Sequence, residues 1–176
     1  MRWISMLLLS GLLAFASAYA MAETRDPYRH FFSPKLGDLA DDLAQARSEG
    51  KTGVLLMFEM DDCPFCTRMK ETVLNRPAVQ DWYRQHFVSF SIDVKGDVPI
   101  TDFKGRATSE KAFALEQRAR ATPVFIFYDL NGEPLTRFTG ATQTPDEFIL
   151  LGRYVVEGRH REMPFNVYKR QHAAGR

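Results

Sequence analysis

A nearly continuous apolar run, GVLLMFEM from Gly53 to Met60, ends just before the only two cysteines of the chain, Cys63 and Cys66. Such a run is typical of a strand that is buried on both faces of a sheet. Pro64 directly follows Cys63, and proline is favoured at the first position of a helix. The apolar residues that come next recur at helical spacing: Met69, Val73 and Leu74. The sequence therefore predicts a buried strand leading into a helix, with Cys63 at the N-cap and Cys66 one turn along the same face.

Helix and strand patterns alternate along the rest of the chain. The helical patterns cover residues 38–49, 78–87, 109–119 and 145–157. The strand patterns cover residues 87–93, 123–129 and 134–140. This alternation predicts an α/β fold in which a central mixed β-sheet is flanked by helices on both faces. We assign three aromatic residues with near-helical spacing to the core: Trp82, Tyr83 and Phe87.

Three segments between these elements have recognisable local patterns. Asn131-Gly132 lies between two strand patterns and predicts a two-residue hairpin turn. The polar segment 94–108 predicts an irregular insertion that contains a short hairpin. The stretch from Gly158 onward is weakly patterned, and we expect it to be a loop.

The first 22 residues have the pattern of a cleaved secretory signal peptide. A basic start precedes an apolar run over residues 3–16, and small residues then suit cleavage after Ala20 or Ala22. The apolar run falls short of the roughly 20 residues that a membrane span needs. We therefore expect the mature chain to be exported and to be periplasmic.

The remaining chain has the features of one folding unit, because no repeat or Pro/Gly-rich linker interrupts it. About 154 residues are enough for one domain with a sizeable core. We expect residues 23–36 to be an N-terminal extension, 37–158 the domain and 159–176 a C-terminal tail. Loss of Arg2 with the signal leaves 22 of the 23 Lys and Arg residues against 22 Asp and Glu residues. This balance predicts no nucleic-acid partner, and we expect a monomer.

The two cysteines allow three interpretations. A structural clip is disfavoured, because closing a loop of two residues removes little chain entropy. A zinc site needs four ligands, and the histidines lack a suitable spacing, although a copper(I) site on two thiolates stays open. These histidines are assigned to the surface: His30, His86, His160 and His172. The third interpretation is a redox pair, in which the helix N-terminus stabilises a Cys63 thiolate as nucleophile and Cys66 is the resolving thiol.

With these elements in place, the chain resembles the thioredoxin superfamily and, more narrowly, its exported SoxW-type thioredoxins. The resemblance extends from about Val54 to Gly158, through the segments LMFEMDDCPFC, TDFKG, TPVFIFYDLNGEPLTRFTG and RYVVEG. It implies a thioredoxin-like fold and a thiol–disulfide oxidoreductase, in which the Cys63 thiolate attacks a substrate disulfide and Cys66 then releases the product. It also implies a cis peptide bond between Thr122 and Pro123, with both residues contacting the substrate.

The chain departs from that family at two buried positions. Thioredoxins have an acid six residues before the first cysteine, whereas this chain has Met57, and the lysine that often accompanies the acid aligns with Ser89. Glu59, near the strand end, is the nearest replacement and a candidate proton relay, although an acid at a strand end is commonly only solvated. Phe65, between the cysteines, is expected to be exposed and to contact the substrate.

The direction of electron flow and the partners are further expectations. Asp61 and Asp62 precede Cys63, and their negative charge disfavours its thiolate, so we expect a reductant rather than a strong oxidant. The resemblance implies protein or small-molecule disulfide substrates and a membrane electron donor of the DsbD or CcdA type. We expect no cofactor and, from the lack of ligand spacing, no metal. A copper(I)-binding or delivery protein and a disulfide isomerase-like exchanger are the alternatives.

Overall fold

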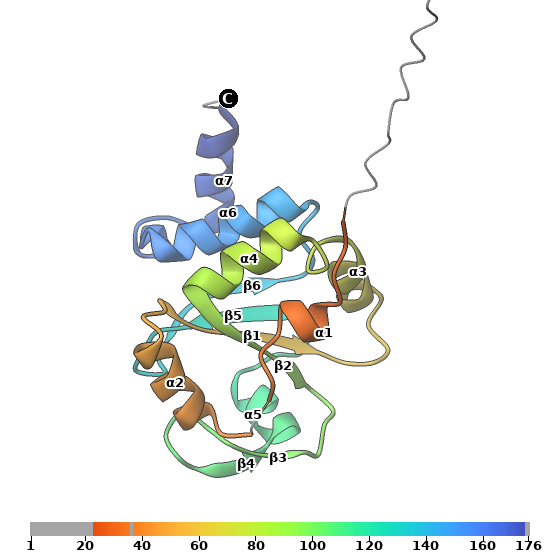
Figure 1. Ribbon diagram of the computed structural model, residues 1–176, viewed down its shortest axis with the longest axis vertical. Helices are drawn as coiled ribbons and strands as arrows, with labels where there is room; N and C mark the ends of the chain where they lie inside the picture. The colour runs from red at the N-terminus through yellow and green to blue at the C-terminus, as the bar shows by residue number, and fades with distance from the viewer. Residues whose placement is uncertain (1–22, 36, 175–176) are drawn as a thin grey trace, which may run out of the picture.

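A four-stranded sheet with the strand order β2-β1-β5-β6 lies at the centre of the computed structural model, which describes residues 23–35 and 37–174 (Figure 1). Its strands are β1 (Gly53–Glu59), β2 (Phe87–Asp93), β5 (Val124–Tyr128) and β6 (Pro134–Thr139). Strand β2 runs parallel to β1, whereas β5 is antiparallel to both of its neighbours, β1 and β6. The predicted mixed sheet is therefore confirmed.

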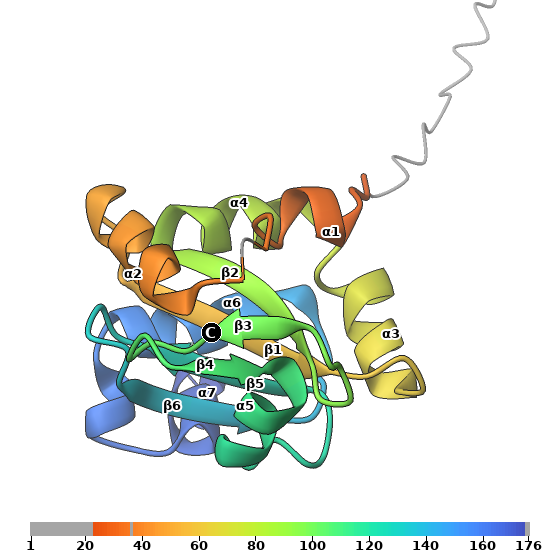
Figure 2. The ribbon, with the colours of Figure 1, turned by 90° about the horizontal axis from the view of Figure 1, so that it is seen from below.

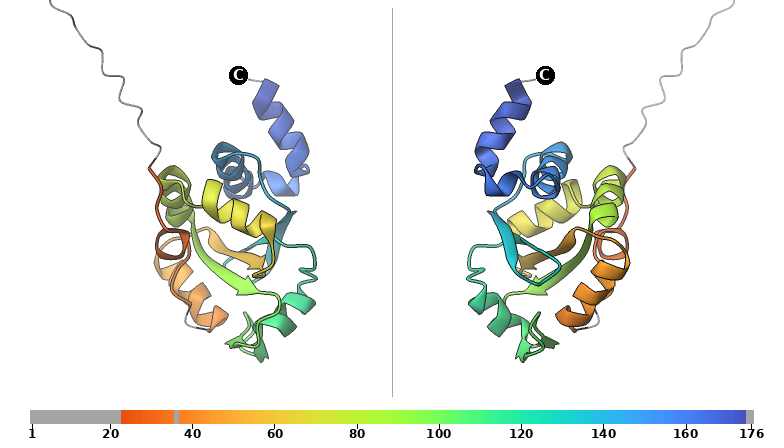
Figure 3. Two further views of the ribbon diagram at one scale, coloured as in Figure 1. Left: turned by 90° about the vertical axis from the view of Figure 1, so that its right-hand side faces the viewer. Right: turned by 90° about the vertical axis from the view of Figure 1, so that its left-hand side faces the viewer.

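Helices cover both faces of this sheet, as predicted. They are α1 (Pro27–His30), α2 (Leu39–Ser48), α3 (Pro64–Thr72), α4 (Pro77–His86), α5 (Glu110–Glu116), α6 (Pro145–Val156) and α7 (Phe165–Ala174), with a short 3₁₀ helix, η1 (Arg159–Arg161). Helices α4 and α6 lie together on one face, and α2 and α5 lie on the opposite face (Figures 1 and 3). The sheet is therefore the middle of three layers.

Strand β1 is buried along its whole length, and its side chains alternate between the two layers. Leu55 and Met57 pack with the residues of α3, α4 and α6. Val54, Leu56 and Phe58 pack with the residues of α2 and α5. A strand that is apolar on both faces is what the continuous run predicted, so that prediction is confirmed.

The aromatic residues assigned to the core lie at the contact between α4, β2 and α6. Tyr83 and Phe87 are fully buried, and Trp82 packs against the same cluster. The Tyr83 hydroxyl donates a hydrogen bond of 2.6 Å to the backbone carbonyl of Phe148. Their assignment to the core is therefore confirmed.

The polar segment after β2 forms the predicted short hairpin. Strands β3 (Pro99–Thr101) and β4 (Ala107–Ser109) pair antiparallel and make a separate two-stranded sheet. A backbone bridge joins Asp38 to Thr101. Because Asp38 is the N-cap of α2, the bridge fixes this hairpin to the start of that helix.

The hairpin between β5 and β6 corrects one prediction, because its turn is not a two-residue turn. The Gly132 N–H donates to the Asp129 carbonyl (3.0 Å), and the Asp129 N–H donates to the Glu133 carbonyl (2.9 Å). Three residues therefore form the loop, and Gly132 adopts a left-handed φ of 78°. The Asp129 carboxylate also accepts from the Asn131 N–H at 2.8 Å, a bond that favours this longer turn.

The loop predicted from Gly158 onward is wrong, because this stretch forms η1 and α7. Tyr168 is buried and donates a hydrogen bond of 2.8 Å to Glu157, while Phe165 lies edge-on to Phe138. Helix α7 projects away from the sheet, so only a narrow side of it packs (Figure 3). A narrow apolar contact gives a weak sequence pattern, which explains the error.

The N-terminal extension is packed onto the domain. Phe31 and Phe32 are buried in the core next to α4 and α6. The Ser33 N–H donates to the Ser89 carbonyl at 2.7 Å and so covers part of the free edge of β2. This extension therefore reaches the sheet and, through Tyr28, the region of the cysteines.

The predicted signal peptide, residues 1–22, lies outside the described residues. Its export and cleavage therefore stay predictions. Of the helices in residues 23–35 and 37–174, none is long and apolar enough to cross a membrane.

Because the carboxyl of Asp42 on α2 is buried, we expect the free energy of unfolding to fall as the pH rises. Asp42 is 2% exposed, its Oδ2 has no hydrogen-bond partner, and burial, followed by the charges of Asp38 and Asp41, raises its pKa to about 7. The unfolded chain loses this proton near pH 4, so the free energy of unfolding should fall between about pH 4 and pH 7. We expect Asp42→Asn to add about 2 kcal/mol above pH 7 and to flatten this dependence in urea unfolding. Asp41→Asn, on the exposed side of α2, is the matched control and should change little.

Candidate active site

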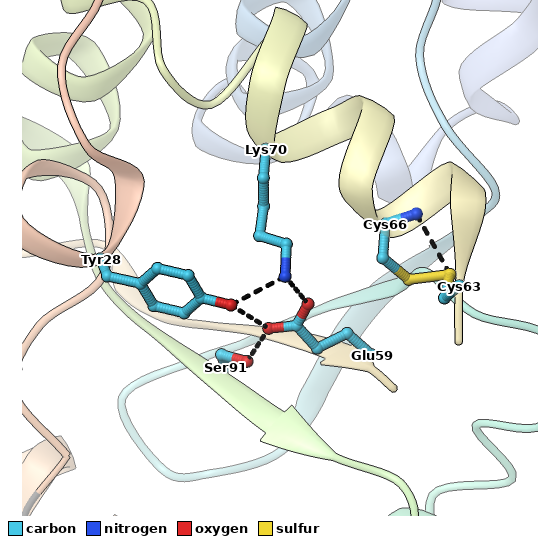
Figure 4. The surroundings of a disulfide bond; sticks show 6 residues. All are labelled: Tyr28, Glu59, Cys63, Cys66, Lys70 and Ser91. Carbon is cyan, nitrogen blue, oxygen red and sulfur yellow. Dashed lines mark hydrogen bonds and ion pairs between the residues drawn. A yellow bond between two sulfur atoms is a disulfide. The ribbon is translucent and has the colours of Figure 1, made fainter. Parts of the chain in front are cut away.

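Helix α3 begins beyond the end of β1 (Figure 2), and Cys63 and Cys66 form a disulfide at its N-terminus (Figure 4). The S–S distance is 2.10 Å and the Cα–Cα distance is 5.2 Å. Cys63 is the N-cap residue, with an extended backbone, and Pro64 begins the helix. The Cys66 N–H donates to the Cys63 Sγ at 3.1 Å. The predicted position of the pair is therefore confirmed.

The two sulfurs occupy unequal positions. Cys63 lies at the helix end, where free N–H groups and the helix dipole stabilise negative charge. Cys66 lies within the first turn instead, although both residues are almost completely buried, with Cys63 4% and Cys66 1% exposed. After reduction, the N-terminal position favours a thiolate at Cys63, as its predicted role as nucleophile requires.

Thr122 and Pro123 lie at the same end of the sheet as the disulfide. The Thr122–Pro123 peptide bond is cis, as expected. Val124 pairs with Phe58 in the antiparallel register of β5 and β1, which places Pro123 opposite the end of β1. A role of Thr122 and Pro123 in substrate contact stays a prediction.

Phe65 extends from the helix tip into solvent and is 57% exposed, so its predicted exposure is confirmed. Asp61 and Asp62, before the first cysteine, are also exposed. The Lys95 Nζ lies 3.8 Å from the Asp62 carboxylate, but both side chains are largely solvated. Such an exposed ion pair screens the acids only weakly.

The surroundings beneath the disulfide are apolar. Met57 is fully buried and belongs to the same core cluster as both cysteines. Ser89 is buried on β2, where it pairs with Leu55 rather than with the residues nearest the cysteines. The position where thioredoxins have their buried acid is therefore occupied by a thioether.

Glu59, the candidate proton relay, is buried at the end of β1 and is not merely solvated. Its side chain is 8% exposed and forms an ion pair of 2.7 Å with the Lys70 Nζ. The Tyr28 hydroxyl lies 3.4 Å from Glu59 Oε1, and the Ser91 hydroxyl donates to the same oxygen (Figure 4). These bonds join the carboxylate to three side chains and none joins it to a sulfur, so the relay role stays a prediction.

Sequence reasoning missed three of these residues. Lys70 could have been found, because it lies four residues after Cys66 and therefore on the same face of α3. Ser91 lies on β2, and Tyr28 lies 31 residues before Glu59 in the chain. Nothing local in the sequence indicates that either residue contacts Glu59.

The part of the chain that the structure describes holds no group of three or more His, Cys, Asp or Glu side chains that could bind a metal ion. The four histidines are partly buried and lie on separate elements: His30, His86, His160 and His172. The two thiols are paired with each other in the disulfide.

The chain combines a mixed sheet between two helical layers with a disulfide at a helix N-terminus and a cis-proline at the same end of the sheet. This combination is typical of thioredoxin-like proteins. A family model described as a thioredoxin-like domain matches residues 39–155. The chain therefore belongs to the thioredoxin-like family. With its Cys63–Cys66 redox pair, it is a thiol–disulfide oxidoreductase.

Solved structures show the same fold, whereas no curated protein matches the chain. A thioredoxin from Thermus thermophilus is 28% identical, with a TM-score of 0.52, covering 66% of this chain and 82% of that one. A thioredoxin-fold protein from Helicobacter pylori is 16% identical, with a TM-score of 0.58, covering 72% and 88%. The oxidised C-terminal domain of DsbD from Neisseria meningitidis is 21% identical, with a TM-score of 0.50, covering 70% and 97%.

Proposed function

We propose that this protein is a periplasmic thioredoxin of the SoxW type that reduces disulfides in exported substrates. The observation that supports this best is the disulfide itself, with Cys63 at the N-cap of α3 and Cys66 within its first turn. The signal-like pattern of residues 1–22 supports export.

The proposed cycle starts from the dithiol form. The Cys63 thiolate attacks one sulfur of the substrate disulfide, and the other substrate sulfur leaves as a thiolate that takes a proton from water. Cys66 then loses its proton and attacks the Cys63 sulfur of the mixed disulfide, which releases the second substrate thiol. The substrate gains two electrons and two protons, and the protein returns to the Cys63–Cys66 disulfide.

In this proposal, three further residues contact the substrate and one acid takes up a proton. Phe65 offers an exposed ring beside the pair, and an apolar substrate segment can pack on it. Thr122 and Pro123 directly precede β5, at the end of the sheet where β1 leads to the cysteines, and an extended substrate could bind there by its backbone. Glu59 is the buried acid nearest in sequence to Cys63, and we assign it the proton that Cys66 loses.

Electrons for the next cycle have to come from outside the protein. An exported dithiol is consumed in an oxidising compartment unless a donor renews it. We propose a membrane donor of the DsbD or CcdA type, which would reduce the Cys63–Cys66 disulfide by the same exchange chemistry. Removal of residues 1–22 should leave the protein in the cytoplasm, whereas the full chain should appear in the periplasmic fraction.

Insulin reduction with dithiothreitol as electron source tests the proposed activity. We expect the protein that starts at residue 23 to accelerate insulin precipitation and to retain no copper after purification. A preparation that keeps copper(I) on its two thiolates and leaves insulin intact would instead support a copper-binding protein. Scrambled ribonuclease distinguishes an isomerase, which would restore its activity without a net supply of electrons.

Phe65→His should make the disulfide more oxidising. Histidine at position 65, between the two cysteines, adds a partly cationic group at an exposed position, which stabilises the Cys63 thiolate and so the reduced form. For a two-electron couple, each 1.4 kcal/mol gained by the reduced form raises the potential by about 30 mV. We expect the parent to equilibrate on the reducing side of glutathione and the variant to lie about 30 mV above it. Phe65→Leu is the uncharged control and should stay near the parent in glutathione buffers.

A further inference from the structure

Four polar side chains from four separate segments meet beside the disulfide (Figure 4). Lys70 on α3 donates to Glu59 Oε2 at 2.7 Å and to the Tyr28 hydroxyl at 2.7 Å. The Tyr28 hydroxyl in turn lies 3.4 Å from Glu59 Oε1, to which the Ser91 hydroxyl also donates. We call these residues the Glu59 cluster: Tyr28, Glu59, Lys70 and Ser91. Both oxygens of a buried carboxylate are thus hydrogen-bonded within it.

The cluster holds one negative and one positive charge, and its carboxylate is buried while Tyr28, at 57% exposure, lies at the surface. The side chains of Glu59 and Lys70 are 8% and 22% exposed. Burial lowers the pKa of Lys70, but the hydrogen bonds and charges of Glu59 and Tyr28 outweigh it and raise the pKa above its usual value. Lys70 is therefore a cation, and its charge offsets that of the carboxylate. A buried ion pair adds little to stability by itself, so its position is the more informative feature.

That position is next to the redox pair. Lys70 follows Cys66 by four residues on α3, which places the two side chains on one face of the helix. Glu59 ends β1, four residues before Cys63, and Figure 4 shows its carboxylate and the Lys70 ammonium on the side of α3 that faces the sheet end. Because the Glu59 carboxylate is buried, its charge and that of its partner are screened less than charges in free solvent. A change in either charge is therefore felt by a Cys63 thiolate.

We propose that the Glu59–Lys70 ion pair sets the reduction potential of the Cys63–Cys66 pair, with Lys70 cancelling the negative charge of Glu59. This inference rests on the proposed redox function. The equilibrium is protein disulfide plus two glutathione molecules giving protein dithiol plus glutathione disulfide. Loss of the Glu59 charge leaves a lone cation that stabilises the thiolate and favours the dithiol. Loss of the Lys70 charge leaves a lone anion that favours the disulfide.

Opposite shifts in two single variants are the expected result. In glutathione buffers at neutral and mildly alkaline pH, we expect Glu59→Gln to raise the equilibrium constant for reduction about tenfold, or about 30 mV. We expect Lys70→Met to lower this constant by a similar factor. The double variant should return to within about twofold of the parent, because both charges are gone. A purely structural role would change stability without giving shifts of opposite sign.

Two controls make this test specific. Lys70→Arg keeps the cation and should leave the equilibrium constant near that of the parent. Arg106→Met removes an arginine from the ion pair with Asp102 in the β3–β4 insertion, and it should also leave the constant unchanged. Melting curves of both redox forms identify any variant that does not fold, and the double variant and Lys70→Arg then still decide the question. Shifts of the same sign, or none, overturn this inference, whereas failure of the parent to reduce insulin overturns the proposed function.

Discussion

With Cys63→Ser, insulin disulfides are expected to be reduced only at the uncatalysed rate. Cys66→Ser should instead accumulate mixed disulfides with the substrate. A serine hydroxyl at the N-cap of α3 is not ionised near neutral pH and cannot attack a disulfide. With Cys63 intact and Cys66 replaced, the first exchange still occurs, but no second thiol releases the substrate. Both results follow from the unequal positions of the sulfurs, since only Cys63 lies at the helix end.

Two measurements check these roles. In the reduced parent, Cys63 should react with iodoacetamide faster than Cys66 near neutral pH, because it is the thiol with thiolate character. Non-reducing gels of the two variants, mixed with a disulfide substrate, should show the adduct for Cys66→Ser alone. Equal alkylation rates would remove the assignment of Cys63 as the nucleophile. An adduct formed by Cys63→Ser would reverse the roles of the two cysteines.

The parts of the fold that the sequence predicted are those whose determinants are local. The buried strand β1 was visible because six of its seven residues, Gly53 to Phe58, are apolar, and Pro64 marked the start of α3 shortly after it. The cysteine position at the helix N-cap followed from these two signals. Strand–helix boundaries of this kind depend on neighbouring residues, so one sequence is enough to find them.

The parts that the sequence did not predict depend on contacts between distant segments. Helix α7 is held by Tyr168 and by the contact of Phe165 with Phe138, so its pattern is too narrow to recognise. The turn after β5 takes its longer form because the Asp129 side chain bonds to the loop backbone. Local turn statistics favour the dipeptide but do not register this competing bond.

The active site shows the same division. Cys63 and Cys66 were found from spacing, whereas the surroundings of Glu59 were not. A solvated acid was expected at the strand end, yet Tyr28 reaches it from the N-terminal extension and Lys70 from α3. Burial of an acid is decided by which segments pack over it, and that information is not present in the residues around Glu59.

Replacing Gly53, the first residue of β1, with alanine is expected to cause a large loss of stability. A Cβ atom at Gly53, the first residue of β1, would lie 2.0 Å from the backbone carbonyl oxygen of Tyr128 and 3.1 Å from its carbon. Tyr128 ends the neighbouring strand β5, so the clash involves backbone on both sides. Relief would require the ends of β1 and β5 to separate, and these are the two inner, fully buried strands of the sheet.

We expect Gly53→Ala to lower the free energy of unfolding by about 3 kcal/mol, at the upper end of what overpacking usually costs. Urea unfolding followed by circular dichroism measures this loss in the oxidised protein. Gly50→Ala is the matched control, since a Cβ there meets nothing within 4 Å and only its left-handed φ of 65° is strained. That control should cost about 1 kcal/mol. If Gly53→Ala unfolds at nearly the same urea concentration as Gly50→Ala, the close approach of β1 to Tyr128 cannot be a fixed feature of the fold.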